Sequence, residues 1–303
     1  MDPIFAGFDG FTYCPALPFE AGVTRRDPSP VIAHEGLYHV WYSRTLESVD
    51  GYSASIWYAT STDGFAWQEQ GEALPKGPAG AFDEHAVFTP SILVAEGRYY
   101  LFYTAVPEPF TNHNGGPRAT PTAIGVACAD TPRGPWTRVA QNPVLRPSPD
   151  PAQFDSMRVD DVCLIARKGG YWMYYKGRQQ GRSPGETKMG LAIASHPTGP
   201  YVKYPANPVL DSGHEVCVWP HGKGVGCLVC AVGPQGNTLQ YSEDGIRFRR
   251  MADTQPPKAP GPFRADNFND GEGPGITWGI AMDVDAPRPY LLRFDTNLSA
   301  LHR

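Results

Sequence analysis

One structural unit recurs along this chain, and it constrains the fold more than any other feature of the sequence. Four times, an apolar run meets a glycine-centred turn and continues into a second, aromatic-rich run. Alternation of apolar and polar residues on both sides of a tight turn is the pattern of a β-hairpin. The four segments are PSPVIAHEGLYHVWYS, TPSILVAEGRYYLFYTA, DDVCLIARKGGYWMYYKG and HEVCVWPHGKGVGCLVCAV.

Each hairpin is followed by a further strand-like run, a turn and an aromatic residue, which is Trp67, Trp136, Tyr201 or Phe248. A weaker fifth copy closes the chain in FNDGEGPGITWGIAMDVDAPRPYLLRF. About four strands in a repeat of about 50 to 70 residues is typical of a propeller blade. Five such units account for the 303 residues, whereas a β-sandwich does not explain five copies of one unit. We therefore predict an all-β chain, a five-bladed β-propeller in which residues 1–303 form one catalytic domain.

Charge and composition limit the partners. The net charge of −5 and the isoelectric point near 5.9 argue against nucleic acid or an anionic membrane surface and favour a neutral ligand. The start MDPIFAGFDGFTYCP has no basic segment followed by an apolar one, and no run reaches the roughly 18 apolar residues of a membrane span. Five of the six cysteines lie in strand-like apolar runs, where a thiol behaves as a small hydrophobe. We expect a cytoplasmic protein with free thiols.

Acids and histidines stand just before the apolar runs of four units. They are Asp27, the triplet Asp83-Glu84-His85, the pair Asp160-Asp161, and the pair His214-Glu215. In a propeller, the first strand of each blade lines the central channel, so side chains at these strand starts converge at one end of it. Asp-Pro is a good turn starter, which explains Asp27 locally but not Asp161 or His214.

Carboxylates and a histidine that converge in an aromatic-rich pocket suggest glycoside hydrolysis. One group protonates the leaving oxygen, and another activates water or attacks the anomeric carbon. We expect Trp57 and Trp219 to stack on a sugar ring. The cations Arg25, Arg26, Lys176 and Arg178 lie near the same strand ends and are expected to bond sugar hydroxyls or to keep the acids ionised.

Metal binding is the rival chemistry, because His85, His214 and several acids could supply nitrogen and oxygen ligands. The sequence has no HxH, HExxH or EF-hand spacing, so no metal site is predicted. No cofactor is predicted to be required, and a divalent cation in the central channel stays open as an alternative. NHNGG at 112–116 is predicted to be a polar loop over the channel mouth.

Five segments of the chain together resemble glycoside hydrolase family 117, the α-1,3-(3,6-anhydro)-L-galactosidases or neoagarobiose hydrolases. The segments are RRDPSPVI…YHVWYSRT, GYSASIWYATSTDG, FDEHAVFTPSIL, FDSMRVDDVCL…YYKGR and SGHEVCVWP. The resemblance runs from about Arg25 to Trp278 and implies a five-bladed propeller. It also implies an exo-acting, inverting enzyme that releases 3,6-anhydro-L-galactose from the non-reducing end of neoagarobiose or neoagaro-oligosaccharides, and a homodimer as one option for its assembly.

The resemblance also implies roles for the strand-start residues. Asp27 is the base that activates water, Asp161 is the second acid beside the ring, and His214 is the general acid, with Glu215 as the alternative for that last role. We expect neighbouring carboxylates to keep the His214 imidazole protonated. Glu84, His85 and Thr89 of the second motif are expected among the substrate contacts. Two alternatives stay open, namely a related propeller glycosidase for an arabinoside or anhydro-D-galactoside, and a non-catalytic carbohydrate-binding propeller.

Overall fold

The structure, a computed structural model, describes residues 3–109 and 120–300, and the predicted loop at 112–116 lies outside them. The described chain is built from β-strands, with two 3-10 turns at Pro3–Phe5 and Pro184–Glu186. The all-β prediction is therefore confirmed. This part of the chain contains no helix long and apolar enough to cross a membrane.

The first three sheets follow one another along the chain, and their strands are antiparallel. The first sheet contains β2 (Thr24–Arg26), β3 (Ile32–His34), β4 (Leu37–Thr45), β5 (Ser55–Ser61) and β6 (Gln68–Leu74). The second contains β7 (Ala86–Ala95), β8 (Arg98–Val106), β9 (Ala123–Ala129) and β10 (Thr137–Arg138). The third contains β11 (Arg158–Arg167), β12 (Gly170–Arg178), β13 (Lys188–Ala194) and β14 (Val202–Lys203).

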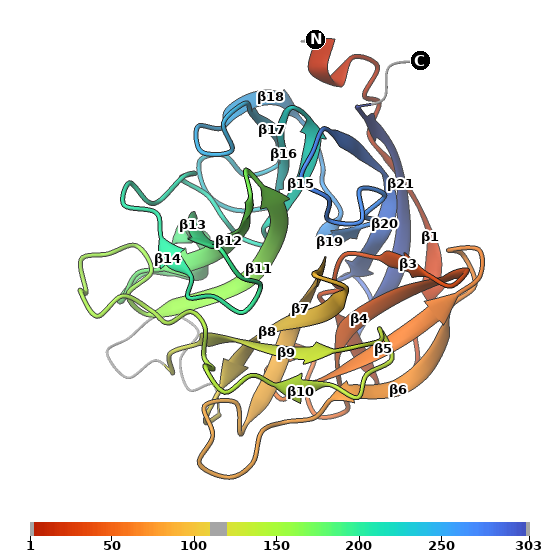
Figure 1. The fold of residues 1–303 in the computed structure, drawn as a ribbon. Helices are drawn as coiled ribbons and strands as arrows, with labels where there is room; N and C mark the ends of the chain where they lie inside the picture. The colour runs from red at the N-terminus through yellow and green to blue at the C-terminus, as the bar shows by residue number, and fades with distance from the viewer. Residues whose placement is uncertain (1–2, 110–119, 301–303) are drawn as a thin grey trace.

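An eight-stranded sheet holds the rest of the chain. Its strands are β15 (Cys217–Gly222), β16 (Gly224–Val229), β17 (Thr238–Ser242), β18 (Arg249–Asp253), β19 (Lys258–Pro262), β20 (Gly273–Asp283), β21 (Tyr290–Ser299) and β1 (Phe11–Leu17). Strand β1 pairs with β21, so the N-terminal strand completes a sheet made by the C-terminal ones. In Figure 1 the strands β7, β11, β15 and β19 lie nearest the centre. The strands that follow each of them in its sheet lie progressively further from the centre.

The predicted hairpin turns are present, and their backbone explains their residues. Glu35-Gly36, Glu96-Gly97 and Lys168-Gly169 each have positive φ at both positions, between 50° and 76°. Two left-handed residues in a two-residue loop match the right-handed twist of the flanking strands, which is why glycine recurs there.

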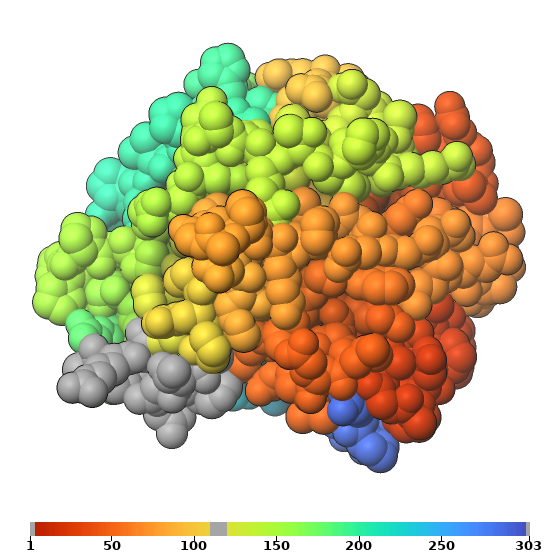
Figure 2. All heavy atoms as spheres, turned by 90° about the horizontal axis from the view of Figure 1, so that it is seen from below, coloured from red at the N-terminus to blue at the C-terminus, as the bar shows by residue number. Residues whose placement is uncertain are grey.

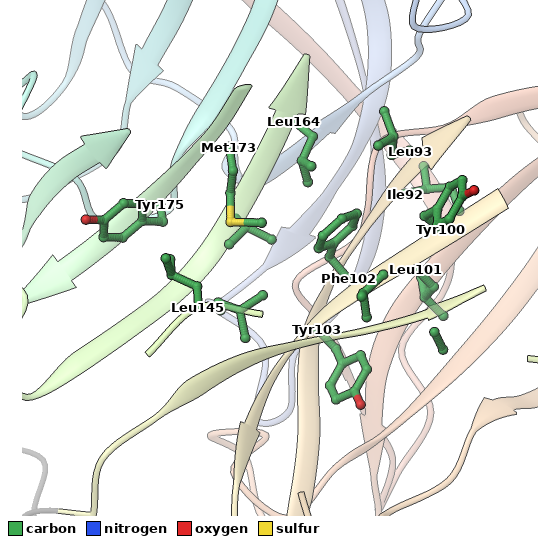
Figure 3. Close-up of a cluster of buried hydrophobic side chains, with 14 of the residues drawn as sticks. Ile92, Leu93, Tyr100, Leu101, Phe102, Tyr103, Leu145, Leu164, Met173 and Tyr175 are labelled. Carbon is green, nitrogen blue, oxygen red and sulfur yellow. The ribbon is translucent and has the colours of Figure 1, made fainter. Parts of the chain in front are cut away.

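Packing between the sheets forms the core. The largest buried cluster joins the first three sheets and includes Trp41 of β4, Leu93 of β7 and Leu164 of β11. Figure 3 shows Phe102 of the second sheet between Leu93 and the third-sheet residues Leu164 and Met173. In Figure 2 the yellow-green segment after β9 lies against the orange segment around residues 70–85, where the Arg138 guanidinium donates to the Pro75 carbonyl at 2.5 Å.

A buried histidine in this core predicts sensitivity to acid. His39 is fully buried against Trp41, and burial, with His34 and Arg133 nearby, lowers the pKa of its imidazole to about 4. Between pH 6.5 and 4 the unfolded chain binds a proton that the native state does not. The free energy of unfolding therefore falls as the pH falls through this window, by about 2 to 3 kcal/mol from this residue.

The variant His39→Phe is expected to lose this part of the acid sensitivity, as measured by urea unfolding at pH 7 and pH 4.5. His196→Gln, a change at an exposed histidine, serves as the control and keeps the wild-type difference. An equal loss of stability in His39→Phe and in the wild type would contradict the assignment.

Candidate active site

A cavity of about 40 Å³ lies where two-residue segments from the four sheets meet. The lining segments are Asp27-Pro28, Thr89-Pro90, Asp161-Val162, Glu215-Val216 and Ala259-Pro260. This confirms the expectation that strand-start acids converge, for Asp27, Asp161 and Glu215. None of the lining residues is aromatic.

The first residue of every lining segment has a left-handed backbone. The φ angles are 51° at Asp27, 45° at Thr89, 48° at Asp161, 54° at Glu215 and 45° at Ala259. Non-glycine residues seldom adopt this conformation, which costs roughly 1 to 3 kcal/mol each. In β7, β11 and β19 the residue lies in a β-bulge, a device that turns a side chain out of the regular alternation. The same strained geometry therefore places all five residues around the cavity.

Lys176 joins the two aspartates of the third sheet. Its Nζ lies 3.1 Å from Asp160 Oδ1 and also donates to Asp161 Oδ2. Burial opposes charge on Asp161, but Lys176 outweighs it and holds the pKa of the Asp161 carboxyl below its usual value. Burial likewise opposes the lysine charge, and the two carboxylates raise the Lys176 pKa. At neutral pH Asp161 is therefore a carboxylate and Lys176 an ammonium.

Asp27 has its own cation. The Arg26 Nε lies 2.8 Å from Asp27 Oδ2. Burial raises the pKa of the Asp27 carboxyl, and the charge and hydrogen bond of Arg26 act against that rise. The pair keeps the negative charge of Asp27 next to a guanidinium, as we expected for one of the two arginines.

Glu215 has a neutral donor instead of a cation as its hydrogen-bond partner. Its Oε2 accepts from the Ala259 backbone N–H at 2.8 Å. Burial raises the pKa of the Glu215 carboxyl, and the charges of Asp27 and Asp161 raise it further. Two carboxylates in one cavity with pKa values moved in opposite directions, Asp161 down and Glu215 up, is the pattern of an acid and base site.

His214 differs from our expectation in its charge. Its Nε2 lies 4.0 Å from Glu215 Oε1, yet burial and then Lys176 lower the pKa of the imidazole to about 4, and Asp161 does not compensate. The expectation that carboxylates hold it protonated near neutral pH is therefore wrong. A neutral imidazole can donate one hydrogen bond and accept another.

From the second sheet, Thr89, one of the predicted substrate contacts, lines the cavity, whereas Asp83, Glu84 and His85 do not. Glu84 is exposed and accepts from the Gly80 N–H at 2.6 Å, and neither it nor His85 lines the cavity. Asp83 is a buried structural residue, bound by Arg138 at 2.6 Å and Tyr103 at 3.0 Å. Asp155 repeats this arrangement in the third sheet with Lys203 and Tyr175. The segments FDEHAVFTP and FDSMRVDDV both begin with Phe-Asp. When these two residues are aligned, Thr89 of the second sheet occupies the same position as Asp161 of the third.

Three other predicted contacts lie elsewhere. Trp219 is 1% exposed in the core, with its indole N–H toward His221, so its prediction as a sugar platform is wrong. Trp57 lies in a separate surface pocket of the first sheet, with the Arg44 guanidinium 4.0 Å above its ring. Arg25 pairs with Glu20 and Glu69 and does not line the cavity.

Arg178 also does not line the cavity. It is buried and is the register partner of Arg158, and it interacts electrostatically with Asp160. Burial and the neighbouring Arg178 lower the pKa of Arg158 to about 10. Arg158 and Tyr52 both interact electrostatically with Asp160 and were not among the predicted site residues, although both lie in motifs that carried the family resemblance, FDSMRVDDV and GYSASIWY.

No three His, Cys, Asp or Glu side chains within residues 3–109 and 120–300 are grouped so that they could hold a metal ion. The chemistry available at the cavity is that of carboxylates, an imidazole and their paired cations.

Comparison with known proteins supports this chemistry. Residues 24–214 match the family profile described as "Glycosyl hydrolases family 32 N-terminal domain". Among solved structures, the chain is similar to Zg3597, a family 117 glycoside hydrolase produced by the marine bacterium Zobellia galactanivorans. The sequence identity is 33%, the TM-score is 0.86, and the match covers 97% of this chain and 92% of that chain. No match was found among curated proteins.

Two more distant structures share the fold. The catalytic domain of the Coprinopsis cinerea GH62 α-L-arabinofuranosidase has 13% identity and a TM-score of 0.65, covering 97% of this chain and 98% of that chain. Fructan 1-exohydrolase IIa from Cichorium intybus has 13% identity and a TM-score of 0.61, covering 97% of this chain and 57% of that chain. Similarity at this level of identity concerns the fold alone.

Proposed function

The chain belongs to glycoside hydrolase family 117 and is therefore a hydrolase of glycosidic bonds; from this premise we propose that it is exo-acting and inverting. It releases 3,6-anhydro-L-galactose from the non-reducing end of neoagarobiose or neoagaro-oligosaccharides. The observation that carries the proposal is the convergence of Asp27, Asp161 and Glu215 on one cavity, where Asp27 is paired with Arg26 and Glu215 accepts from the Ala259 backbone N–H. The shared motifs support the sugar specificity.

The proposed architecture is a closed five-bladed propeller that forms one catalytic domain. The eight-stranded sheet then counts as two blades, β15–β18 and β19–β20–β21–β1, which are joined by the pairs His221↔Pro274 and Gly222↔Gly273. Five lining segments, each headed by a left-handed residue, support one blade per segment. Closure by the N-terminal strand β1 is supported by its pairing with β21.

In the proposed reaction, Asp27 accepts a proton from the water that attacks the anomeric carbon. Glu215 donates its proton to the leaving glycosidic oxygen as the carbon–oxygen bond breaks. Burial raises the pKa of both carboxyls, and their partners distinguish them. Asp27 is suited to the base role because it is paired with the Arg26 guanidinium, and Glu215 to the acid role because its hydrogen-bond donor is the neutral Ala259 N–H. A cavity of about 40 Å³ has room for a few water molecules and is too small for a sugar ring, which lies at its mouth.

Asp161 and His214 have supporting roles in this proposal. Asp161 stays ionised through Lys176 and stabilises the positive charge that develops on the sugar ring. His214 contributes a neutral imidazole that hydrogen-bonds a sugar oxygen. Glu215 thus replaces His214 as the general acid, the role that the resemblance implied for the histidine.

A reducing, cytoplasmic setting is also proposed, and a small oligosaccharide is the proposed partner. All six cysteines are free thiols, which is the usual state in the cytosol. The homodimer that the resemblance implies is retained as part of the proposal.

A panel of oligosaccharides tests the proposal. The purified protein is incubated with neoagaro-oligosaccharides, with carrageenan-derived oligosaccharides and with nitrophenyl arabinosides, and the products are identified by mass spectrometry and NMR. The expected result is 3,6-anhydro-L-galactose as the first monosaccharide released, from the agar series alone. Release of arabinose or anhydro-D-galactose, with the agar series untouched, would overturn the substrate assignment.

A further inference from the structure

Within residues 3–109 and 120–300, no aromatic side chain lines the cavity, although sugar-binding sites generally use one. The two tryptophans predicted to stack on a sugar ring do not line the cavity. Trp219 is buried in the core, and the ring of Trp57 is covered by Arg44.

The segment between β4 and β5, residues 46–54, reaches across toward the second sheet and is held on both sides. On the first sheet, Thr24 Oγ1 donates to the Ser48 carbonyl at 2.6 Å. On the second, the Val87 N–H donates to the Ala54 carbonyl at 3.1 Å. The segment is therefore a fixed bridge between two sheets at the end of the fold where Asp27 lies.

Tyr52 stands in this bridge beside the residues that line the cavity. Its backbone N–H donates to Asp50 Oδ1 at 3.2 Å, and its ring packs on Phe88 with centroids 5.5 Å apart. Phe88 directly precedes the cavity residue Thr89. Gly51 lies so close to Arg26 that a Cβ there would be 2.6 Å from the arginine Cδ, and Arg26 is the partner of Asp27.

The charged groups that act on the Tyr52 hydroxyl are those of the candidate active site. It interacts electrostatically with Lys176 and Arg26 and with the carboxylates of Asp160 and Asp27. Burial and the two carboxylates raise the pKa of the phenol against the effect of the two cations. The raised pKa favours the protonated phenol, so the group that lies among these charges is a neutral hydroxyl.

We propose that Tyr52 is a substrate-contacting residue of this site, its ring providing the apolar surface for the sugar at the cavity mouth and its hydroxyl a hydrogen bond to a sugar oxygen. The observation behind it is the placement of a partly exposed tyrosine whose ring packs on Phe88 of the second sheet and whose neighbour Gly51 lies against Arg26 of the first. The inference rests on the proposed function of the cavity as the glycoside-binding site.

Two variants at this position separate ring from hydroxyl. Tyr52→Ala is expected to raise KM by about 10- to 100-fold with kcat changed by less than about 3-fold, because a contact made equally in the ground and transition states affects KM alone. Tyr52→Phe keeps the ring and is expected to raise KM by about 10-fold or less. Tyr13→Ala removes a tyrosine that is 48% exposed on β1 and serves as the control, with wild-type kinetics expected.

The measurement is steady-state kinetics on a glycoside that the wild type cleaves, with circular dichroism to verify folding of each variant. A KM within 2-fold of wild type in folded Tyr52→Ala would overturn the inference, and so would a loss confined to kcat. If the wild-type enzyme cleaved another glycoside but not neoagarobiose, that result would overturn the proposed substrate. The Tyr52 variants are then tested on the cleaved glycoside, so the two failures are distinguishable.

Discussion

Asp27→Asn is expected to lower kcat on the natural oligosaccharide by about 10²- to 10⁴-fold, the usual contribution of a general base. The amide has nearly the same shape as the carboxylate but cannot accept the proton of the attacking water. It also removes the negative partner of Arg26, whose Nε lies 2.8 Å from Asp27 Oδ2. KM is expected to change far less than kcat, because the lost interaction develops mainly in the transition state.

Asp130→Asn provides the control for this change. Asp130 is an exposed carboxylate, also paired with an arginine, since Arg98 Nε lies 2.8 Å from its Oδ1. The control is expected to keep wild-type activity, and thermal unfolding verifies that both variants fold. Turnover within about 3-fold of wild type in Asp27→Asn would remove Asp27 from the base role.

Glu215→Gln and His214→Ala are expected to separate the two candidates for the general acid. Glu215→Gln should lower kcat/KM on the natural substrate by about 10²- to 10⁴-fold, because the leaving sugar oxygen then departs without a proton. The loss should shrink strongly on an aryl glycoside with a nitrophenol leaving group, which departs as a stable anion. His214→Ala should cost about 10-fold or less on both substrates, the worth of one hydrogen bond.

The comparison of the two leaving groups makes the assignment specific. A residue that only positions the sugar affects both substrates equally, whereas an acid affects the one whose leaving group needs protonation. If His214→Ala showed the leaving-group dependence and Glu215→Gln did not, the histidine would be the acid despite the lowered pKa of its imidazole.

The strands of this fold could be predicted from the sequence because their turns carry a strong local signal. Glu-Gly and Lys-Gly pairs at positions of positive φ mark three hairpins, and the alternation beside them marks the strands. The pairing of β1 with β21 could not be predicted in this way. The two strands lie at opposite ends of the chain, and no local pattern in FTYCPAL indicates which strand it pairs with.

The convergence of side chains was predicted where an acid and a strand start coincide, and Asp27, Asp161 and Glu215 do line one cavity. In the second sheet, Asp83, Glu84 and His85 precede the position that lines the cavity, which holds Thr89, a residue predicted only as a substrate contact. The aligned Phe-Asp pairs in the second and third units carried the needed signal. Trp219 failed for another reason. It packs against Gly226 across the strand pair, where a Cβ would lie 2.5 Å from the indole, and such packing follows from register rather than residue type.

The protonation states of the site residues are the property that residue types alone predicted least well. Carboxylates near His214 suggested a protonated imidazole, but burial and the ammonium of Lys176 outweigh them and lower its pKa to about 4. The sign of such a shift depends on depth and on which charges lie closest. The contact of Tyr52 with Phe88 also could not be predicted, because the motif GYSASIWY does not indicate which side chain of another sheet lies beside it.

The most direct measurement is a crystal structure of the folded Glu215→Gln variant with a bound neoagaro-oligosaccharide. The account predicts that the anomeric carbon lies over the cavity between Asp27 and Asp161, with the glycosidic oxygen within about 3 Å of the side chain at position 215. It also predicts the Tyr52 ring against the sugar. A glycosidic oxygen bonded to His214 instead, or an oligosaccharide bound away from the residues that line this cavity, would contradict it.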